Sequence, residues 1–165
     1  MECTLPTIII RHRRENVKKC SLRGFETRSD FQFFSYPDCS DALPDLSQYV
    51  VLDIYGEPLS ARDSGCGLML LDATWRLAER MKRQLRALDR VPKRSIPKGF
   101  QTAYPRRQAD CPNPEEGLAS IEALWIAYRL MGKNGDFLLD NYYWKQQFFE
   151  KNHMTEISCS DIIII

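Results

Sequence analysis

The sequence has no apolar run that approaches the length of a membrane span, no internal repeat and no Cys-x-x-Cys pair. A transmembrane helix needs about 20 consecutive apolar residues, and zinc ligands recur at short, regular spacings. The six cysteines are scattered, and the two histidines, His12 and His153, lie far apart in the chain. We therefore expect neither a membrane partner nor a bound metal.

The amino-terminal stretch also lacks the order of a secretory signal, because its basic residues follow the apolar run TIII instead of preceding it. The chain has 165 residues, of which 44% are hydrophobic and 27% are charged. That size and composition are typical of one globular domain. We expect a cytoplasmic protein whose cysteines are reduced thiols, several of them packed in the core.

The net charge of +1 conceals an uneven distribution of charge along the chain. Residues 80–94 contain seven basic side chains and one acid, whereas the rest of the chain has more acids than bases. A second basic cluster comprises residues 11–14 (RHRR), with Lys18 and Lys19 nearby. Such clusters are typical of surfaces that bind phosphates, although a solvated helix face is the alternative for residues 80–94.

Short apolar, β-branched and aromatic runs predict strands, and apolar residues at helical spacing predict helices. The expected strands are residues 7–10, 31–34, 49–53 and 67–71, with a further strand at 98–103. The expected helices run from Thr74 to about Leu88, over 118–131 and over 136–152, with a proline-containing loop at 104–117. Strands that alternate with helices predict an α/β fold with a mainly parallel sheet.

The end of the strand at 67–71 is the first candidate for a site, because ligands of such folds bind beyond the carboxyl ends of the strands. Asp72 ends this strand, and Thr74 and Trp75 begin the helix that follows. Asp72 or Thr74 can instead cap that helix, and Trp75 can instead pack in the core. The sequence leaves these alternatives open.

Five short segments occur in an order and spacing that resemble a known enzyme family. They are residues 18–21 (KKCS), 59–63 (LSARD), 71–75 (LDATW), 118–123 (LASIEA) and 143–152 (YWKQQFFEKN). From about Arg11 to Asn152, the chain resembles the RNA aminocarboxypropyltransferases that use S-adenosylmethionine, a superfamily that includes the DTW-domain proteins and the small-subunit rRNA aminocarboxypropyltransferase of ribosome biogenesis. The third segment matches the Asp-x-Ser/Thr-Trp motif that names the DTW group. Residues 103–107 (AYPRR) depart from the corresponding loop of the rRNA enzymes, so the target RNA stays open.

This resemblance implies a SPOUT-like fold, with helices on both faces of the sheet and a deep trefoil knot in the carboxyl-terminal half. It implies a single domain over residues 1–155, followed by a tail at 156–165. The amino-terminal α/β part would extend to about residue 72, and the knotted part that binds the cofactor would cover about 73–155.

The resemblance also implies S-adenosylmethionine as the donor substrate and assigns residues to its binding. The loop at 101–104 and the start of the helix at 118 would surround the adenosine, while Trp75 and Ala78 would enclose the methyl group on sulfur. An indole face suits a sulfonium cation. The expected cofactor-binding residues are Thr74, Trp75, Ala78, Gln101, Ala103, Tyr104, Leu118 and Ser120.

With the methyl group shielded, the γ-carbon of the methionine arm is the carbon left facing an RNA base, and the 3-amino-3-carboxypropyl group is transferred. Asp72 is the expected catalytic residue, either as the acceptor of the proton from uridine N3 or as a group that orients the base or the amino-acid arm. The expected partner is rRNA or tRNA, bound by Arg83, Arg86, Arg94, Arg106 and Arg107.

Two other functions fit the same residues. A SPOUT RNA methyltransferase would keep the fold and the cofactor, but Trp75 and Ala78 argue against it. A non-catalytic RNA-binding factor in ribosome assembly would need no cofactor. The by-product separates the enzymes, since aminocarboxypropyl transfer releases methylthioadenosine and methyl transfer releases S-adenosylhomocysteine.

Overall fold

The computed structural model of the chain describes residues 4–105 and 117–154. Arg106, Arg107 and the tail at 156–165, which the sequence analysis singled out, lie outside the described residues.

The described residues form one sheet of five parallel strands in the order β2-β1-β4-β3-β5. The strands are β1 (Thr7–His12), β2 (Phe31–Tyr36), β3 (Tyr49–Pro58), β4 (Gly67–Asp72) and β5 (Lys93–Ser95). The four strands expected from the longest apolar runs are present, and the expected α/β fold with a mainly parallel sheet is confirmed. The central strand β4 is buried over almost its whole length, as its uninterrupted apolar sequence predicts.

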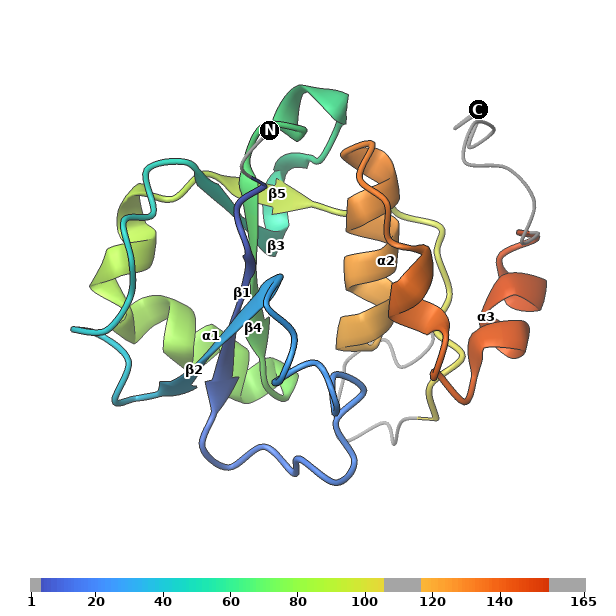
Figure 1. Cartoon of the computed structure of the whole chain (residues 1–165), viewed down its shortest axis with the longest axis horizontal. Helices are drawn as coiled ribbons and strands as arrows, with labels where there is room; N and C mark the ends of the chain where they lie inside the picture. The colour runs from blue at the N-terminus through green and yellow to red at the C-terminus, as the bar shows by residue number, and fades with distance from the viewer. Residues whose placement is uncertain (1–3, 106–116, 155–165) are drawn as a thin grey trace.

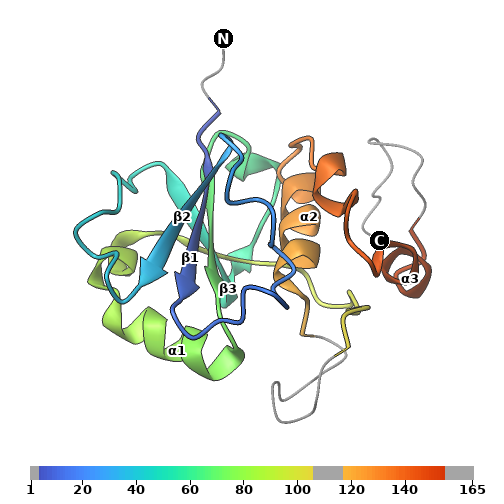
Figure 2. The ribbon, with the colours of Figure 1, turned by 60° about the horizontal axis from the view of Figure 1, so that its bottom comes forward.

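Helices cover both faces of the sheet, as Figures 1 and 2 show. Helix α1 (Trp75–Gln84) lies on one face, and helices α2 (Ser120–Leu130) and α3 (Lys145–Lys151) lie on the other. The pleat divides the core accordingly, because successive side chains of a strand point to opposite faces. Ile8 and Ile10 pack with Met81 of α1, whereas Ile9 packs with the apolar residues of α2.

The first expected helix is shorter than its apolar pattern predicts. α1 ends at Gln84, and a 3₁₀ helix, η2 (Arg86–Arg90), follows it. The cause lies in the spacing of Leu85, Leu88 and Val91, which are all buried and are three residues apart. A period of three matches a 3₁₀ helix rather than an α-helix.

The strand expected at 98–103 is wrong. Strand β5 instead occupies Lys93–Ser95, between Pro92 and Pro97, and pairs with β3 at the edge of the sheet. Prolines flanking a short strand are common at a sheet edge, where one side of the strand needs no partner. Residues 98–103 form no helix or strand, and backbone groups of residues 101–103 bond to side chains instead.

The last expected helix is divided. A 3₁₀ helix, η4 (Asp136–Leu139), and α3 are separated by residues 140–144. The interruption lets the Tyr142 hydroxyl reach the side chain of Glu122 in α2. No helix in the two described ranges has the length and hydropathy needed to cross a bilayer. The described cysteines, Cys20, Cys39 and Cys66, are free thiols.

Candidate functional site at the carboxyl edge of the sheet

Asp72, at the carboxyl end of β4, is the centre of a buried polar cluster. Its side chain is 4% exposed and accepts hydrogen bonds on both carboxylate oxygens. Oδ2 accepts from Arg11 Nε at 2.8 Å and from Cys20 Sγ at 3.1 Å, and Oδ1 accepts from Ser120 Oγ at 3.0 Å. These three donors come from β1, from the loop after β1 and from the start of α2. Asp72 therefore joins segments that are far apart in the sequence.

Arg11 is the cation of this cluster. It is the register partner of Asp72 in the parallel pair β1–β4, so the two side chains leave the sheet side by side. Its Nη1 also donates to Glu26 at 2.8 Å, and its guanidinium lies over the Phe33 ring. Burial acts to lower the pKa of Arg11, but the hydrogen bonds to Asp72 and Glu26 outweigh it and raise the pKa. The cluster therefore holds a fixed positive charge beside Asp72.

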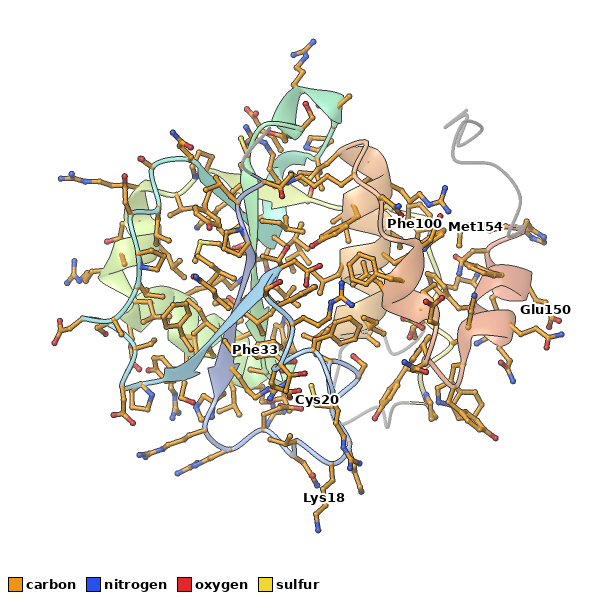
Figure 3. All side chains as sticks on the ribbon, in the orientation of Figure 1. Lys18, Cys20, Phe33, Phe100, Glu150 and Met154 are labelled. Carbon is orange, nitrogen blue, oxygen red and sulfur yellow. The ribbon has the colours of Figure 1, made fainter. Side chains whose placement is uncertain are left out.

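Cys20 contributes a thiol that donates to the carboxylate. Burial and the adjacent charge of Asp72 raise the pKa of Cys20 to about 12. The thiol is therefore protonated at neutral pH, as a donor to Asp72 must be. Figure 3 shows Cys20 inside the lower edge of the molecule, where β1 ends, whereas the side chain of Lys18 in the same loop points away from it.

Neither alternative that the sequence left open for this stretch holds. The Asp72 side chain bonds to the three donors above, and the Thr74 side chain makes no capping hydrogen bond at the start of α1. Trp75 is 40% exposed and belongs to neither core cluster. The start of α1 thus places an accessible indole next to the edge where Asp72 is buried, without a packing role that explains it.

Glu122, two residues beyond Ser120 in α2, is the centre of a second buried cluster. It is completely buried and accepts four hydrogen bonds. Oε1 accepts from Ala103 N at 2.9 Å and Tyr142 Oη at 2.8 Å, and Oε2 accepts from Thr102 Oγ1 at 2.7 Å and Ala119 N at 2.9 Å. A carboxylate is the side chain that can accept all four bonds. Glu122 thereby fixes the loop at 101–104 against the start of α2.

The same loop is fixed at its other end by Asn152, which follows α3. The Asn152 side chain accepts from Gln101 N at 2.7 Å and donates to Gln101 O at 2.8 Å. The Tyr104 hydroxyl donates to the carbonyl of Lys19 at 2.9 Å. The N–H groups of residues 101, 103 and 104 are thus bonded within the protein. A ligand at this loop would be bound through carbonyl oxygens and side chains rather than through these N–H groups.

The structure places the residues that the sequence predicted for cofactor binding in two groups, one at the start of α1 and one at the start of α2 with the loop at 101–104. Ser120 touches Asp72, and Leu118 adjoins the same end of α2. The loop that contains Gln101, Ala103 and Tyr104 is bonded to α2 through Glu122, and Thr74, Trp75 and Ala78 begin the helix that follows Asp72. Their binding to a ligand remains a prediction, since the geometry fixes only their neighbourhood.

The arginines predicted to bind RNA are not equivalent. Arg83 and Arg86 are exposed. Arg94 instead bonds to Asp63 through Nε at 2.9 Å and approaches Glu57 at 3.8 Å. Residues 80–94 are called the basic stripe below. Lys82 in this stripe is also bonded to carboxylates, since it pairs with Asp53 at 3.2 Å and also with Glu79. The stripe read from the sequence is therefore partly a set of internal ion pairs.

One segment of the family resemblance lies away from this edge. Residues 59–63 include the 3₁₀ helix η1 (Ala61–Asp63), which leads into the amino end of β4. Asp63 is buried in a capping box with Ser60 and pairs with Arg94. This segment has a structural account of its own. Among the residues that the structure describes, no group of three acids, cysteines or histidines is arranged to hold a metal ion.

Sequence reasoning missed Arg11 and Cys20 as members of the Asp72 cluster, and it did not assign a role to Glu122 or Asn152. Arg11 ends the first expected strand as Asp72 ends the fourth, but the sequence does not say that these strands are neighbours. Glu122 was visible as an acid inside an apolar helix pattern, which is the usual sign of a buried, fully bonded carboxylate.

Comparison with known proteins gives one structural likeness. No family model matches the chain, and no curated protein matches its sequence. The fold resembles that of the SAM-dependent rRNA:acp-transferase Tsr3 from Vulcanisaeta distributa, with a TM-score of 0.69 and 23% sequence identity over 91% of this chain and 80% of that one. At this identity the likeness establishes a shared fold.

Proposed function

We propose that this protein transfers the 3-amino-3-carboxypropyl group of S-adenosylmethionine to a uridine-type base of rRNA. The fold likeness to Tsr3, described as a SAM-dependent rRNA:acp-transferase, supports the donor, the transferred group and the class of RNA. Fold alone does not carry function, because one fold hosts many chemistries. The proposal therefore rests on the residues at the carboxyl edge.

The observation that carries the proposal is the convergence of four of the five segments that resemble the aminocarboxypropyltransferases. Cys20 of the first segment and Ser120 of the fourth both bond to Asp72 of the third. The Ser21 hydroxyl accepts from Ile121 N at 3.1 Å, and Asn152 of the last segment holds the loop at 101–104. Hydrogen bonds thus link segments scattered over about 130 positions of sequence. Packing alone does not require hydrogen-bonding residues from four segments at one sheet edge.

The residues at this edge fit S-adenosylmethionine chemically. Trp75 presents a partly exposed indole face, which suits a sulfonium cation and its methyl group. Ala78, three residues further along α1, adds a small apolar side chain. The loop at 101–104 and residues 118–120 have the backbone carbonyls and side chains for the adenosine. In this proposal residues 1–155 form one SPOUT-like unit with a knotted cofactor-binding part after about residue 72, allied to the DTW proteins.

When bound, S-adenosylmethionine supplies an electrophilic γ-carbon, and the protein decides which carbon on sulfur faces the base. Trp75 and Ala78 shield the methyl group, so that the acceptor nitrogen meets the γ-carbon. Holding the two reactants in line contributes much of the rate enhancement of such a transfer. The hydrogen bond between Asp72 and Ser120 ties β4 to α2, and α1 follows β4 directly in the chain.

Asp72 is given a positioning role in this proposal, which is one of the two roles expected for it. Its side chain is 4% exposed, and three donors already occupy its oxygens. A general base must come within hydrogen-bond reach of the proton that it removes, and Asp72 reaches a base only if a covering residue moves. By fixing Ser120 and the loop with Cys20, Asp72 orients both walls of the site. Proton transfer to Asp72 stays a prediction that turnover measurements address.

The test is mass spectrometry of nucleosides from rRNA and tRNA of cells with and without this gene. The proposal predicts that an aminocarboxypropyl-modified uridine-type nucleoside of rRNA disappears in the cells that lack the gene and returns with the wild-type gene. Cells that receive the Trp75→Ala gene instead should regain less of the modified nucleoside than cells that receive the wild-type gene. Loss of a methylated nucleoside instead would favour the methyltransferase, and unchanged rRNA and tRNA nucleosides would leave only a non-catalytic role.

A further inference from the structure

The turn that follows β1 carries Arg13 and Arg14 beside the candidate site, and helix α1 carries a third arginine, Arg80. In this turn Glu15 N donates to His12 O at 2.8 Å, and Arg14 N donates to His12 Nδ1 at 3.0 Å. Arg13 N donates to Tyr36 O at 3.1 Å, which ties the turn to the end of β2. These backbone bonds hold the turn in place, while the side chains of Arg13 and Arg14 are exposed.

Helix α1 contributes the third arginine. The hydroxyl of Tyr36 bonds to Gln84 in the last turn of α1, and the His12 ring packs on the Tyr36 ring at 5.3 Å between centroids. Arg80 precedes Gln84 by four residues and therefore lies on the same face of the helix. Burial and then the charges of Arg14, Arg13 and Arg80 lower the pKa of His12, so that all three guanidinium groups act on this ring.

These arginines differ from Lys82 and Arg94, the two residues of the basic stripe at 80–94 that are paired with carboxylates. Arg13, Arg14 and Arg80 form no ion pair with an acid of residues 4–105 or 117–154. A cluster of like charges without counter-charges is costly unless an anionic partner is bound. The cluster is therefore available to phosphates.

The position of this arginine cluster relative to Asp72 indicates which RNA phosphates lie within its reach. Arg13 is two residues beyond Arg11, which holds Asp72, so their backbones are at most about 7 Å apart. The turn therefore adjoins the end of β1 that holds Asp72, so phosphates bound there would belong to nucleotides close to one in the site.

We propose that Arg13, Arg14 and Arg80 bind the RNA backbone phosphates that flank the target nucleotide. This inference rests on the proposed function for the identity of the partner. It places the RNA across the carboxyl ends of β1 and β2, and the paired Lys82 and Arg94 outside its path. The bases themselves make no contact with these arginines, so the contribution to affinity is independent of sequence.

The test compares reversal of these charges with reversal of a charge at the opposite edge. The variants are Arg80→Glu, the triple variant Arg13→Glu/Arg14→Glu/Arg80→Glu, and Arg62→Glu as the control. Arg62 is exposed in η1, which leads into the amino end of β4. Binding of a short single-stranded RNA of mixed sequence is measured over a range of salt concentrations, and S-adenosylmethionine binding is measured by calorimetry.

We expect the triple variant to lose at least about tenfold in RNA affinity at low salt and to reduce the slope of log K against log salt by about 2, since each phosphate contact on a single strand contributes about 0.7. Arg80→Glu should show part of this loss. Arg62→Glu should bind RNA like the wild type, and all variants should bind S-adenosylmethionine equally, which also reports that they are folded.

Equal RNA affinity and slope in the wild type and the triple variant would overturn this inference while leaving the proposed function intact. If RNA binding depended on the three arginines but the wild type did not bind S-adenosylmethionine, the proposed function would fail and this inference would stand. A loss as large in Arg62→Glu as in Arg80→Glu would reduce the effect to net charge and also overturn the inference.

A second readout is local. Phosphates at the three arginines offset their charges, so RNA binding should raise the pKa of His12. The chemical shifts of the His12 ring protons, recorded as a function of pH, measure this change. The groups that face this ring are Arg13, Arg14 and Arg80, with Tyr36 stacked against it. An unchanged titration of His12 in saturated RNA complex would place the RNA elsewhere.

Discussion

Arg11 and Asp72 face each other across two neighbouring parallel strands and form a buried ion pair, with Arg11 Nε 2.8 Å from Asp72 Oδ2. The pair is the link between the sheet and the elements around the candidate site. Because Cys20 and Ser120 bond to the same carboxylate, the loss of Asp72 affects two walls of the site at once.

Asp72→Asn should therefore lower the free energy of unfolding by about 3 kcal/mol, as is usual when one partner of a buried ion pair is removed. Asp30→Asn is the matched control, since it breaks an ion pair of the same 2.8 Å length with Arg28 in which both side chains are more than 40% exposed. The control should cost less than about 1 kcal/mol. Urea denaturation measures both, and equal losses would refute the structural role of Asp72.

The same variant separates the two roles of Asp72 in catalysis. A positioning role predicts weaker S-adenosylmethionine binding in the folded Asp72→Asn protein, together with lower turnover. Unchanged cofactor affinity with a loss of turnover on the order of 10²-fold would instead assign proton transfer to Asp72. Calorimetry and single-turnover kinetics on the same preparation distinguish the outcomes.

Trp75→Ala should weaken S-adenosylmethionine binding by about 1–2 kcal/mol, because it removes the aromatic face and the apolar wall proposed for the sulfonium group. Stability should change little, since the ring is 40% exposed. Tyr143→Ala removes another exposed ring, at 81% exposure, and should change neither quantity. Calorimetry that finds wild-type affinity in folded Trp75→Ala would remove Trp75 from the pocket.

Cys20 reports on the charge of Asp72. Because its pKa is raised to about 12, the thiol of the native protein should react slowly with iodoacetamide at pH 8. Asp72→Asn removes the negative charge while Arg11 Nη2 remains 3.5 Å from the sulfur, so alkylation should accelerate by about tenfold or more. Cys66 does not touch this cluster and serves as the internal control in peptide mass spectrometry. No acceleration at Cys20 would contradict the contact.

The pH dependence of stability should carry the signature of His12, whose pKa is lowered in the folded state by burial and by three arginines. As the pH falls below about 6.5, the unfolded chain binds a proton at this position before the folded chain does. The free energy of unfolding should therefore fall, with a slope from this residue of at most about 1.4 kcal/mol per pH unit. His12→Asn keeps an acceptor for Arg14 N and should flatten the profile between pH 7 and 5. An identical profile would show that His12 does not titrate abnormally.

Much of the sheet could be predicted from the sequence, because continuous apolar runs such as residues 67–71 have few alternatives to a buried strand. The edge strand β5 could not, since three residues between prolines carry no periodic signal. The division of the last expected helix depends on Tyr142 reaching Glu122, which is a tertiary contact. Local patterns contain no information of that kind.

The candidate site could be predicted only in part, because local patterns do not show which segments meet in the fold. Asp72 and Trp75 could be singled out because the end of a parallel strand is where ligands bind. Arg11 and Cys20 became visible only when β1 was seen to lie beside β4 and its following loop to return to the edge. The basic residues at 80–94 are not equivalent, because the fold pairs Lys82 and Arg94 with carboxylates and leaves Arg83 and Arg86 exposed, which the sequence could not show.

The most direct test of the proposed function is the by-product that the purified protein releases from S-adenosylmethionine in the presence of rRNA that lacks the modification. The account predicts methylthioadenosine in an amount equal to the aminocarboxypropyl groups found on the RNA, and much less of both with Trp75→Ala. Release of S-adenosylhomocysteine with methylated RNA, or no conversion by a protein that binds the RNA, would contradict it.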